Sequence, residues 1–406
     1  MKNISTLFAL YLLAFTLQAQ QFNEATIRKH IKILASDSLQ GRGTGTEGER
    51  MAATYIENEF KKLKLKSTGK SKNYLQTFEF KSGAHGEGAP GTAHNIVAYL
   101  NNKAANTIII GAHYDHLGIG EFGNSLDANP AGKIHNGADD NASGVAGVLE
   151  LARYFSSNKV KEKNNFLFLC FSGEELGLYG SKYFTENPTI NLEQVNYMIN
   201  MDMIGRLDPQ TNTVVVNGTG TSPVWEPLLK KLETETLKIK TDSSGIGPSD
   251  HTSFYLKNIP VLHFFTGAHG DYHKPTDDWD KINYAGQVNV LNLIAEVINS
   301  LDKEPKLTFL TTKAKPMASR SAFKVTLGVM PSYTSEGDGV KVDGVTEGRP
   351  GQKAGIQTGD IIIQMGDLTI KDIQDYMGAL GKFDKGQTIP VKLKRGTEVI
   401  TLSVTF

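Results

Sequence analysis

The stretch TIIIGAHYDH, residues Thr107–His116, decides the fold class of this chain. Its β-branched run Thr107–Ile110, followed by a glycine, predicts a buried strand. In open α/β sheets, ligands bind just beyond the carboxyl ends of the strands. His113 is therefore a candidate metal ligand, with Asp115 behind it to hold the imidazole in one tautomer. The alternative interpretation is a solvated turn at the end of the strand.

Other segments repeat this pattern along the chain. We expect further strands at His94–Leu100, Asn165–Ser172, Tyr197–Met201 and Ile259–Phe265, and helices at Asn23–Ala35, Glu49–Lys64 and Val145–Phe155. Strands that alternate with helical segments indicate a parallel sheet covered on both faces. The sequence therefore predicts an α/β fold with a mostly parallel central sheet and helices on both faces.

Acidic and imidazole side chains recur where these strands end. Glu174 and Glu175 follow one strand, Asp202 another, and His273 lies in the loop after a third, while Asp139 and Asp140 precede a helix that opens near the same edge. Carboxylates gathered in one crevice repel one another unless a cation neutralises them. Histidine and carboxylate together suit zinc better than calcium, which prefers oxygen alone.

The number of these ligands exceeds what one tetrahedral zinc needs. Two metals bridged by a carboxylate and a water would use them all. The adjacent pair Glu174 and Glu175 suits a division of roles, in which one carboxylate binds metal and the other takes a proton from the water.

Composition excludes several other classes of protein. The chain has 406 residues, 39% of them hydrophobic and 21% charged, which is typical of a soluble globular protein of two or three domains. It has 43 basic and 43 acidic residues, so no charge imbalance points to a nucleic-acid partner. The single cysteine, Cys170, lies in an apolar run and is expected to be a packed thiol.

The N-terminus predicts export. Lys2, a short apolar run and the residues Gln18, Ala19 and Gln20 form a pattern typical of a signal peptide over residues 1–20. No later stretch is long and apolar enough for a transmembrane helix. We therefore expect a periplasmic or extracellular protein.

Five segments together resemble one enzyme family. GAHYDH, GADDNASG, FSGEELGLYGS, NMDMIG and DYHKPTDD, in this order, are similar to the zinc-dependent aminopeptidases typified by bacterial leucyl aminopeptidases, and the similarity covers about residues 23–300. Glutamate carboxypeptidase and glutaminyl cyclase are more distant relatives. The resemblance implies a zinc peptidase domain over residues 21–302 that binds two zinc ions.

The resemblance also implies a role for each site residue. His113 and Asp202 would hold one zinc, Glu175 and His273 the other, and Asp139 would bridge them. Glu174 would be the general base, and Asp115 would orient His113. The family further implies a cis peptide bond between Asp139 and Asp140.

Other polar residues near these segments have more than one interpretation. Asp140 and Asn141 could cap the following helix. Asp250 is expected beside the pocket or behind the ligands, and Tyr272, next to His273, could help stabilise an oxyanion. His116 and His269 are expected to be local hydrogen-bonding histidines. A serine mechanism at Ser249–His251 is disfavoured because no Gly-x-Ser-x-Gly turn precedes these residues.

The C-terminal part has a different pattern. Residues 303–320 are rich in Lys, Pro and Thr and predict a linker. Residues 321–406 have short strands, one helix at Ile373–Leu380 and many glycines. The segments Thr326–Val329 and Ala354–Ile362 are similar to PDZ domains of bacterial secreted proteases. Such a domain would bind the C-terminus of a peptide, or would only pack against the peptidase.

The leading hypothesis is a secreted two-zinc exopeptidase that removes N-terminal residues from peptides. Within enzymes, the alternatives are a carboxypeptidase or a glutaminyl cyclase with one zinc. A further alternative is a peptide-binding scaffold that acts through its PDZ-like domain.

Overall fold

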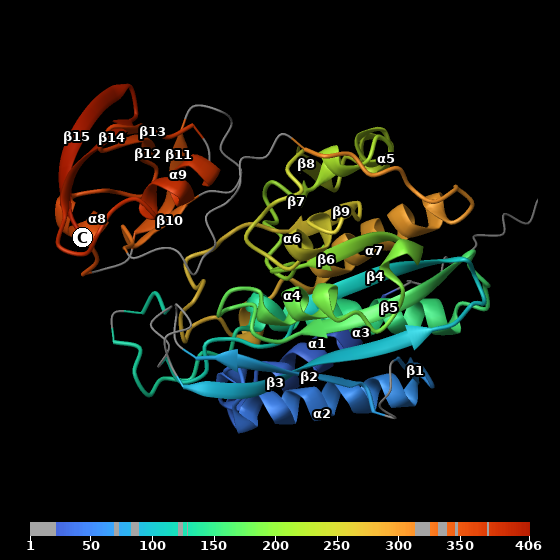
Figure 1. The fold of residues 1–406 in the computed structure, drawn as a ribbon. Helices are drawn as coiled ribbons and strands as arrows, with labels where there is room; N and C mark the ends of the chain where they lie inside the picture. The colour runs from blue at the N-terminus through green and yellow to red at the C-terminus, as the bar shows by residue number, and fades with distance from the viewer. Residues whose placement is uncertain are drawn as a thin grey trace, which may run out of the picture.

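The computed structural model describes residues 22–68, 73–82, 89–120, 125–127, 129–312, 325–331, 339–345, 348–371 and 373–406. The signal peptide predicted for residues 1–20 lies outside these ranges. Figure 1 shows a large α/β domain followed by a small C-terminal domain. Each has its own core of buried apolar side chains.

The large domain is organised around a sheet of nine strands in the described part of the chain. Their order is β1-β3-β5-β4-β6-β9-β7-β8, and β2 pairs with the outer part of β3. The strands are β1 (Lys66–Ser67), β2 (Leu75–Lys81), β3 (Pro90–Leu100), β4 (Asn106–His113), β5 (Asn164–Phe171), β6 (Val195–Met201), β7 (Thr213–Asn217), β8 (Lys238–Asp242) and β9 (Val261–Phe265).

The centre of the sheet is parallel and its flanks are mixed. β5, β4, β6 and β9 pair in parallel, whereas β3 joins β5 and β7 joins β9 in antiparallel register. The α/β fold expected from the sequence is confirmed, with the parallel pairs at the position where the site residues were predicted. Parallel pairing brings the carboxyl ends of β4, β5, β6 and β9 to one edge.

Helices cover both faces of the sheet because its central strands are apolar on both sides. Ile108 and Ile110 pack into the larger core, and Ile109 between them packs into the core on the other face. The first face carries α1 (Glu24–Leu34), α2 (Glu47–Lys62), α3 (Gly144–Ser157), α5 (Trp225–Leu232) and α7 (Tyr284–Leu301). The second carries α4 (Tyr179–Glu186) and α6 (His251–Tyr255) (Figure 1).

Short helical turns complete this domain. They are η1 (Asp37–Arg42), η2 (Ala138–Ser143), η3 (Leu192–Gln194), η4 (Thr219–Thr221) and η5 (Trp279–Lys281). No helix among the described residues has the length and apolar character needed to cross a membrane.

The described part of the small domain is an antiparallel sheet with two helices. Its strands are β10 (Val329–Pro331), β11 (Val340–Val345), β12 (Ile361–Met365), β13 (Leu368–Thr369), β14 (Thr388–Arg395) and β15 (Glu398–Thr405), and its helices are α8 (Pro350–Ala354) and α9 (Ile373–Leu380). The helix expected at Ile373–Leu380 is present as α9. Arg395 pairs with Asp360 through two nitrogens, which ties β14 to the turn before β12.

The described part of the predicted linker, residues 303–312, follows the surface of the large domain. Leu307 is buried and its N–H donates to Asn196 Oδ1 at 2.8 Å. Thr312 N–H donates to the hydroxyl of Tyr255 at 2.9 Å. These contacts show that the first half of this segment is packed rather than extended into solvent.

Candidate active site

The ends of the four parallel strands bring the predicted residues together. His113 ends β4, Glu174 and Glu175 follow β5, Asp202 follows β6, and the loop after β9 carries His273. Asp140 lies in η2, just before α3. His113, Asp140, Glu174 and Glu175 are buried, and Asp202 is partly buried. Residues separated by up to 160 positions in the sequence (from 113 to 273) therefore meet at one edge of the sheet.

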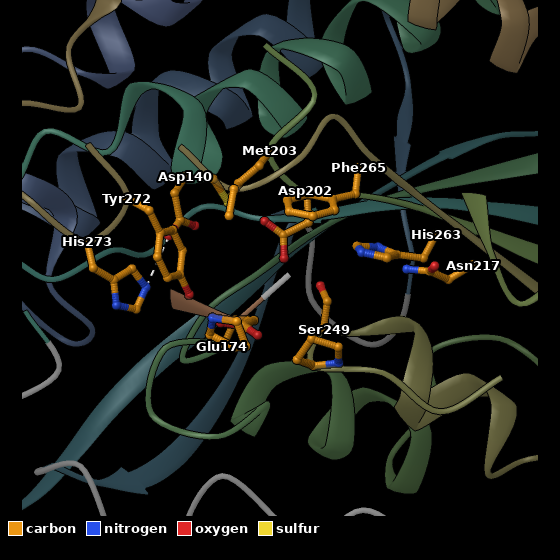
Figure 2. Close-up of a pocket in the computed structure, with 13 residues that line it drawn as sticks. Asp140, Glu174, Asp202, Met203, Asn217, Ser249, His263, Phe265, Tyr272 and His273 are labelled. Atoms are coloured by element: carbon orange, nitrogen blue, oxygen red, sulfur yellow. Dashed lines mark ion pairs between the residues drawn. The ribbon is translucent and has the colours of Figure 1, made fainter. Parts of the chain in front are cut away.

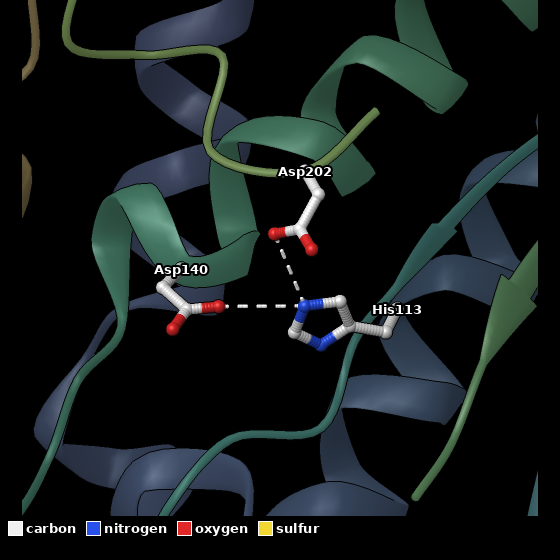
Figure 3. Close-up of side chains that lie close together, drawn as sticks. All are labelled: His113, Asp140 and Asp202. Carbon is white, nitrogen blue, oxygen red and sulfur yellow. Dashed lines mark hydrogen bonds and ion pairs between the residues drawn. The ribbon is translucent and has the colours of Figure 1, made fainter. Parts of the chain in front are cut away.

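Asp140 lies between two histidines and contacts both. Its Oδ1 is 3.3 Å from His113 Nε2, and its Oδ2 is 3.2 Å from His273 Nε2. His113 Nε2 is also 3.3 Å from Asp202 Oδ1 (Figure 3), and His273 Nε2 is 3.2 Å from Glu175 Oε2. The carboxylate of Asp140 thus belongs to two clusters, one on each of its oxygens.

These distances match the donor geometry of zinc. Two ligand atoms bound ~2.0–2.1 Å from one tetrahedral zinc lie about 3.3 Å apart. His113 Nε2 lies about this far from one oxygen of Asp140 and one oxygen of Asp202. His273 Nε2 lies about this far from the other oxygen of Asp140 and one oxygen of Glu175. The histidine nitrogens and carboxylate oxygens are therefore spaced as zinc ligands would be, and His113, Asp140 and Asp202 form a group that could hold a metal ion.

The structure corrects the prediction that Asp139 is the bridging residue. Asp139 points away from both clusters: its Oδ1 accepts a hydrogen bond from Gly205 N–H at 2.7 Å, and its Oδ2 is 3.2 Å from His269 Nε2. Neighbouring residues in this turn direct their side chains to opposite sides. Asp277 Oδ2 holds the turn by accepting from the N–H groups of both Asp139 and Asp140, each at 3.0 Å.

The predicted position of the cis peptide bond is wrong by one residue. The cis bond joins Asp140 to Asn141, not Asp139 to Asp140. Asn141 does not act as a helix cap alone, since its Oδ1 accepts from Gly144 N–H and also from Met203 N–H beside Asp202. Asp140, rather than Asp139, is the aspartate that contacts His113 and His273.

Asp115 connects His113 with the two glutamates. Its Oδ1 is 3.6 Å from His113 Nδ1, and its backbone oxygen is 3.2 Å from the same nitrogen. The same carboxylate accepts hydrogen bonds from the N–H groups of Glu174 and Glu175, at 3.2 and 3.4 Å. Thr44, between η1 and α2, donates its hydroxyl to Asp115 Oδ2 at 2.9 Å. One buried carboxylate thus positions parts of β4 and of the loop after β5.

Nearby carboxylates raise the pKa values of two histidines of the site, His113 and His273. Burial lowers the pKa of His113, but the charge of Asp202 and the nearby carboxylates outweigh burial and raise this pKa well above its usual range. Burial likewise opposes charge on His273, whereas Glu175 and Asp140 raise its pKa to about 10. Zinc binds neutral imidazole, so metal binding here would release protons.

His116 is closer to the site than the sequence indicated. Its Nδ1 is 2.8 Å from Glu175 Oε1 and 3.8 Å from Asp140 Oδ2. Its ring packs edge-on against His273, with 5.9 Å between the centroids. Its Nε2 is buried and has no hydrogen-bond partner among the described residues. His116, Asp140 and Glu175 form a second group that could hold a metal. The sequence feature that could have indicated this position is that His116 lies in the same HYDH segment as His113.

A pocket opens in front of these residues (Figure 2). Glu174 and Asp202 line it beside Asp140 and His273, and the ring of Tyr272 stacks on His273 at 3.9 Å. The remaining lining residues are Met203, Asn217, Pro248, Ser249, His263, Phe265, Ala268 and Pro331. Apart from Pro331, which belongs to the small domain, all of these residues belong to the large domain.

Asp250 lies outside the lining of this pocket. Its side chain is fully buried, and burial raises its pKa to about 7. Its neighbour Ser249 lines the pocket and accepts a hydrogen bond from Asn200 Nδ2 at 2.8 Å. The structure therefore places Asp250 behind the pocket rather than in contact with its contents.

Comparison with known proteins identifies the family of each domain. Residues 95–298, half of the chain, match the model of peptidase family M28. The chain belongs to peptidase family M28. Residues 325–406 match the PDZ domain model, so the small domain of this M28 protein is a PDZ domain.

Curated relatives of the M28 domain include two bacterial enzymes. Leupeptin-inactivating enzyme 1 of Streptomyces exfoliatus is 29% identical over 256 residues, which cover 62% of this chain and 50% of that protein. Aminopeptidase YwaD of Bacillus subtilis is 28% identical over 246 residues, covering 56% of this chain and 49% of that protein. This M28 chain therefore spans about half the length of these relatives.

Solved structures share the fold of the M28 domain. The zinc aminopeptidase BSAP of Bacillus subtilis aligns with a TM-score of 0.53 at 20% identity, covering 72% of this chain and 99% of that one. Glutaminyl cyclase of Porphyromonas gingivalis aligns with a TM-score of 0.56 at 19% identity, covering 70% of this chain and 99% of that one.

Proposed function

We propose that this M28 protein is an exported aminopeptidase that uses two zinc ions to remove N-terminal residues from peptides. The observation that carries the proposal is the position of Asp140, whose two oxygens face two different histidine and carboxylate pairs. A bridging carboxylate is the feature that a two-metal site needs and a one-metal site does not.

In this proposal, His113 and Asp202 would hold one zinc, Glu175 and His273 would hold the other, and Asp140 would contribute to both sites. His116 contributes to the second cluster, either as a ligand or by orienting Glu175. Bound zinc supplies Lewis acidity, which lowers the pKa of a water and polarises the substrate carbonyl.

Glu174 is the proposed general base. It lines the pocket beside Asp140 and Asp202, and its backbone N–H is held by Asp115. Its carboxylate would accept a proton from the attacking water and pass it to the leaving amine. Tyr272 stacks on His273 and lines the pocket, and in this proposal its hydroxyl would donate a hydrogen bond to the developing oxyanion.

The main alternative is different chemistry at the same site. A glutaminyl cyclase or a carboxypeptidase would keep the fold, as the likeness to the Porphyromonas gingivalis structure illustrates. A single bound zinc would favour the cyclase, and two zinc ions would favour the peptidase. A scaffold protein that acts through its PDZ domain would need neither.

The proposal is tested with Leu-p-nitroanilide and other aminoacyl anilides. We expect hydrolysis that stops with a chelator and returns with zinc. Elemental analysis should find two zinc ions per chain.

The variant Glu174→Gln separates catalysis from metal binding. Loss of the general base should lower kcat by about 10²–10⁴-fold, while both zinc ions stay bound. Glu186→Gln, an exposed position at the end of α4, is the matched control and should retain wild-type kcat. Full activity of Glu174→Gln, or activity that chelators leave untouched, contradicts the mechanism.

A further inference from the structure

The PDZ domain has a free sheet edge. β10 is the terminal strand of its sheet and pairs with β11 on one side only, within the part of the chain that the structure describes. A strand edge without a backbone partner can accept an extended peptide as an additional antiparallel strand. The strand covers three residues, Val329–Pro331.

A cationic side chain lies beside the turn that leads into β10. Gly328 has φ +68°, and a Cβ placed there would lie 2.1 Å from Arg349 Cβ, so the stem of Arg349 packs directly on this turn. Thr326 Oγ1 accepts the Gly328 N–H at 3.0 Å. A peptide carboxylate could replace that hydroxyl and pair with the guanidinium of Arg349, because arginine and backbone N–H groups are its usual partners.

The other end of β10 reaches the candidate active site. Pro331 lines the same pocket as Glu174 and His273. Arg349 Nη2 also lies 3.5 Å from the backbone oxygen of Ser125, in the M28 domain. The turn and the strand of the PDZ domain are therefore both next to the peptidase domain.

The direction of an added strand decides what reaches the pocket. A peptide that pairs antiparallel to β10, with its carboxylate at Gly328, runs toward its own N-terminus in the direction of Pro331. Its N-terminal residue is then directed into the pocket that holds Glu174. The opposite polarity would place a carboxylate, not an amine, at the pocket.

We propose that the PDZ domain is a substrate subsite that holds the C-terminal carboxylate of a short peptide while the M28 site cleaves its N-terminal residue. This inference rests on the proposed aminopeptidase function. With three residues paired along β10, one residue whose carboxylate lies at Gly328, and one or two residues in the pocket, the best substrates would have about five or six residues.

The test uses the full-length wild-type protein and peptides that begin with Leu. Leu-led peptides of two, four, six and eight residues are compared as free acids and as C-terminal amides. We expect kcat/KM for the six-residue free acid to exceed that of its amide by about tenfold, mainly through KM. The dipeptide pair should show no such gain from this subsite. Equal kcat/KM for the six-residue acid and amide overturns the inference.

A variant of Arg349 tests whether this side chain causes the preference for the free acid. Arg349→Gln should reduce the ratio of kcat/KM for acid over amide to about 1, because the carboxylate loses its charged partner. Lys353→Gln, an exposed cation on α8, is the control and should keep the wild-type ratio. An unchanged ratio in Arg349→Gln overturns the role of this turn. Hydrolysis of Leu-p-nitroanilide by the wild-type protein keeps the two proposals separate, since only failure of the aminopeptidase function abolishes it.

Discussion

At the scale of single residues, the site depends on which of two adjacent aspartates faces the histidines. Asp140 is within 3.3 Å of both His113 and His273, whereas Asp139 is bound to Gly205 and His269 on the other side of the turn. The two residues have the same chemistry, so the difference between their contacts comes from the directions of their side chains alone.

A pair of isosteric variants tests this assignment. Asp140→Asn removes the charge shared by both clusters, and we expect it to lose one or both zinc ions and at least about 10²-fold in kcat/KM. Asp139→Asn should retain two zinc ions, because Asp139 contacts neither cluster. Elemental analysis after dialysis measures the outcome. Retention of both zinc ions by Asp140→Asn would exclude Asp140 as the bridge.

Glu49 makes the stability of the protein depend on pH. It is buried in α2, where its carboxylate accepts hydrogen bonds from Ser172 and from Gly45 N–H. Burial, and then the charge of Asp115, raise its pKa from 4.5 to about 8. The folded protein thus keeps a proton that the unfolded chain loses above about pH 4.5, so this group makes stability fall as pH rises toward 8.

The substitution Glu49→Gln keeps the size and shape of the side chain and removes its ionisable carboxyl group. The free energy of unfolding of the variant, relative to wild type, should increase by about 3–4 kcal/mol between about pH 5 and pH 8. Urea denaturation at the two pH values measures it. A constant difference between the two proteins would show that Glu49 is ionised at both pH values.

At the scale of elements, Arg42 joins three segments that are distant in sequence. It is buried at the end of η1 and donates to the backbone oxygens of Leu34, Tyr114, Asn136 and Gly137. These oxygens belong to the end of α1, the segment after β4 and the approach to Asp140. Burial lowers the pKa of Arg42 to about 10, while nearby acids such as Asp140 counter that effect.

Arg42→Met leaves these carbonyl groups buried without a donor. We expect a loss of about 3–5 kcal/mol in the free energy of unfolding, because a methionine of similar length fills the space but donates nothing. Arg50→Met is the control: its ion pair with Glu47 is exposed, and its effect should stay within about 1 kcal/mol. Equal urea midpoints for the two variants would contradict this role of Arg42.

At the scale of the whole molecule, metal ions would link five segments of the M28 domain but none of the PDZ domain. The two domains have separate apolar cores. Binding to the folded state alone stabilises a domain by about 2.7 kcal/mol at a ligand concentration of 100 Kd. Chelation should therefore lower the Tm of the M28 domain and leave the PDZ transition unchanged. Calorimetry with chelator, and then with zinc, measures both transitions; an M28 transition insensitive to chelation would contradict metal binding.

The sequence by itself determined the α/β fold and most of the candidate site. Hydrophobic period and β-branched content predict the central strands, and the carboxyl ends of parallel strands lie at one edge of a sheet. The sequence therefore predicts that one edge gathers the side chains of His113, Glu174, Glu175, Asp202 and His273. The flanking strands β2, β7 and β8 escaped prediction because they are short or partly exposed, and their pairing comes from contacts distant in the chain.

Only the tertiary structure decided between Asp139 and Asp140, and only it placed Pro331 at the pocket. Two adjacent residues of a turn have nearly the same neighbours in the sequence. The direction of each side chain is set by the residues with which it forms hydrogen bonds or ion pairs. Here those partners are Asp277, Gly205 and His269, which lie more than 60 positions away. Local patterns carry no information about such contacts, because the contacts exist only once the sheet edges and loops have packed together.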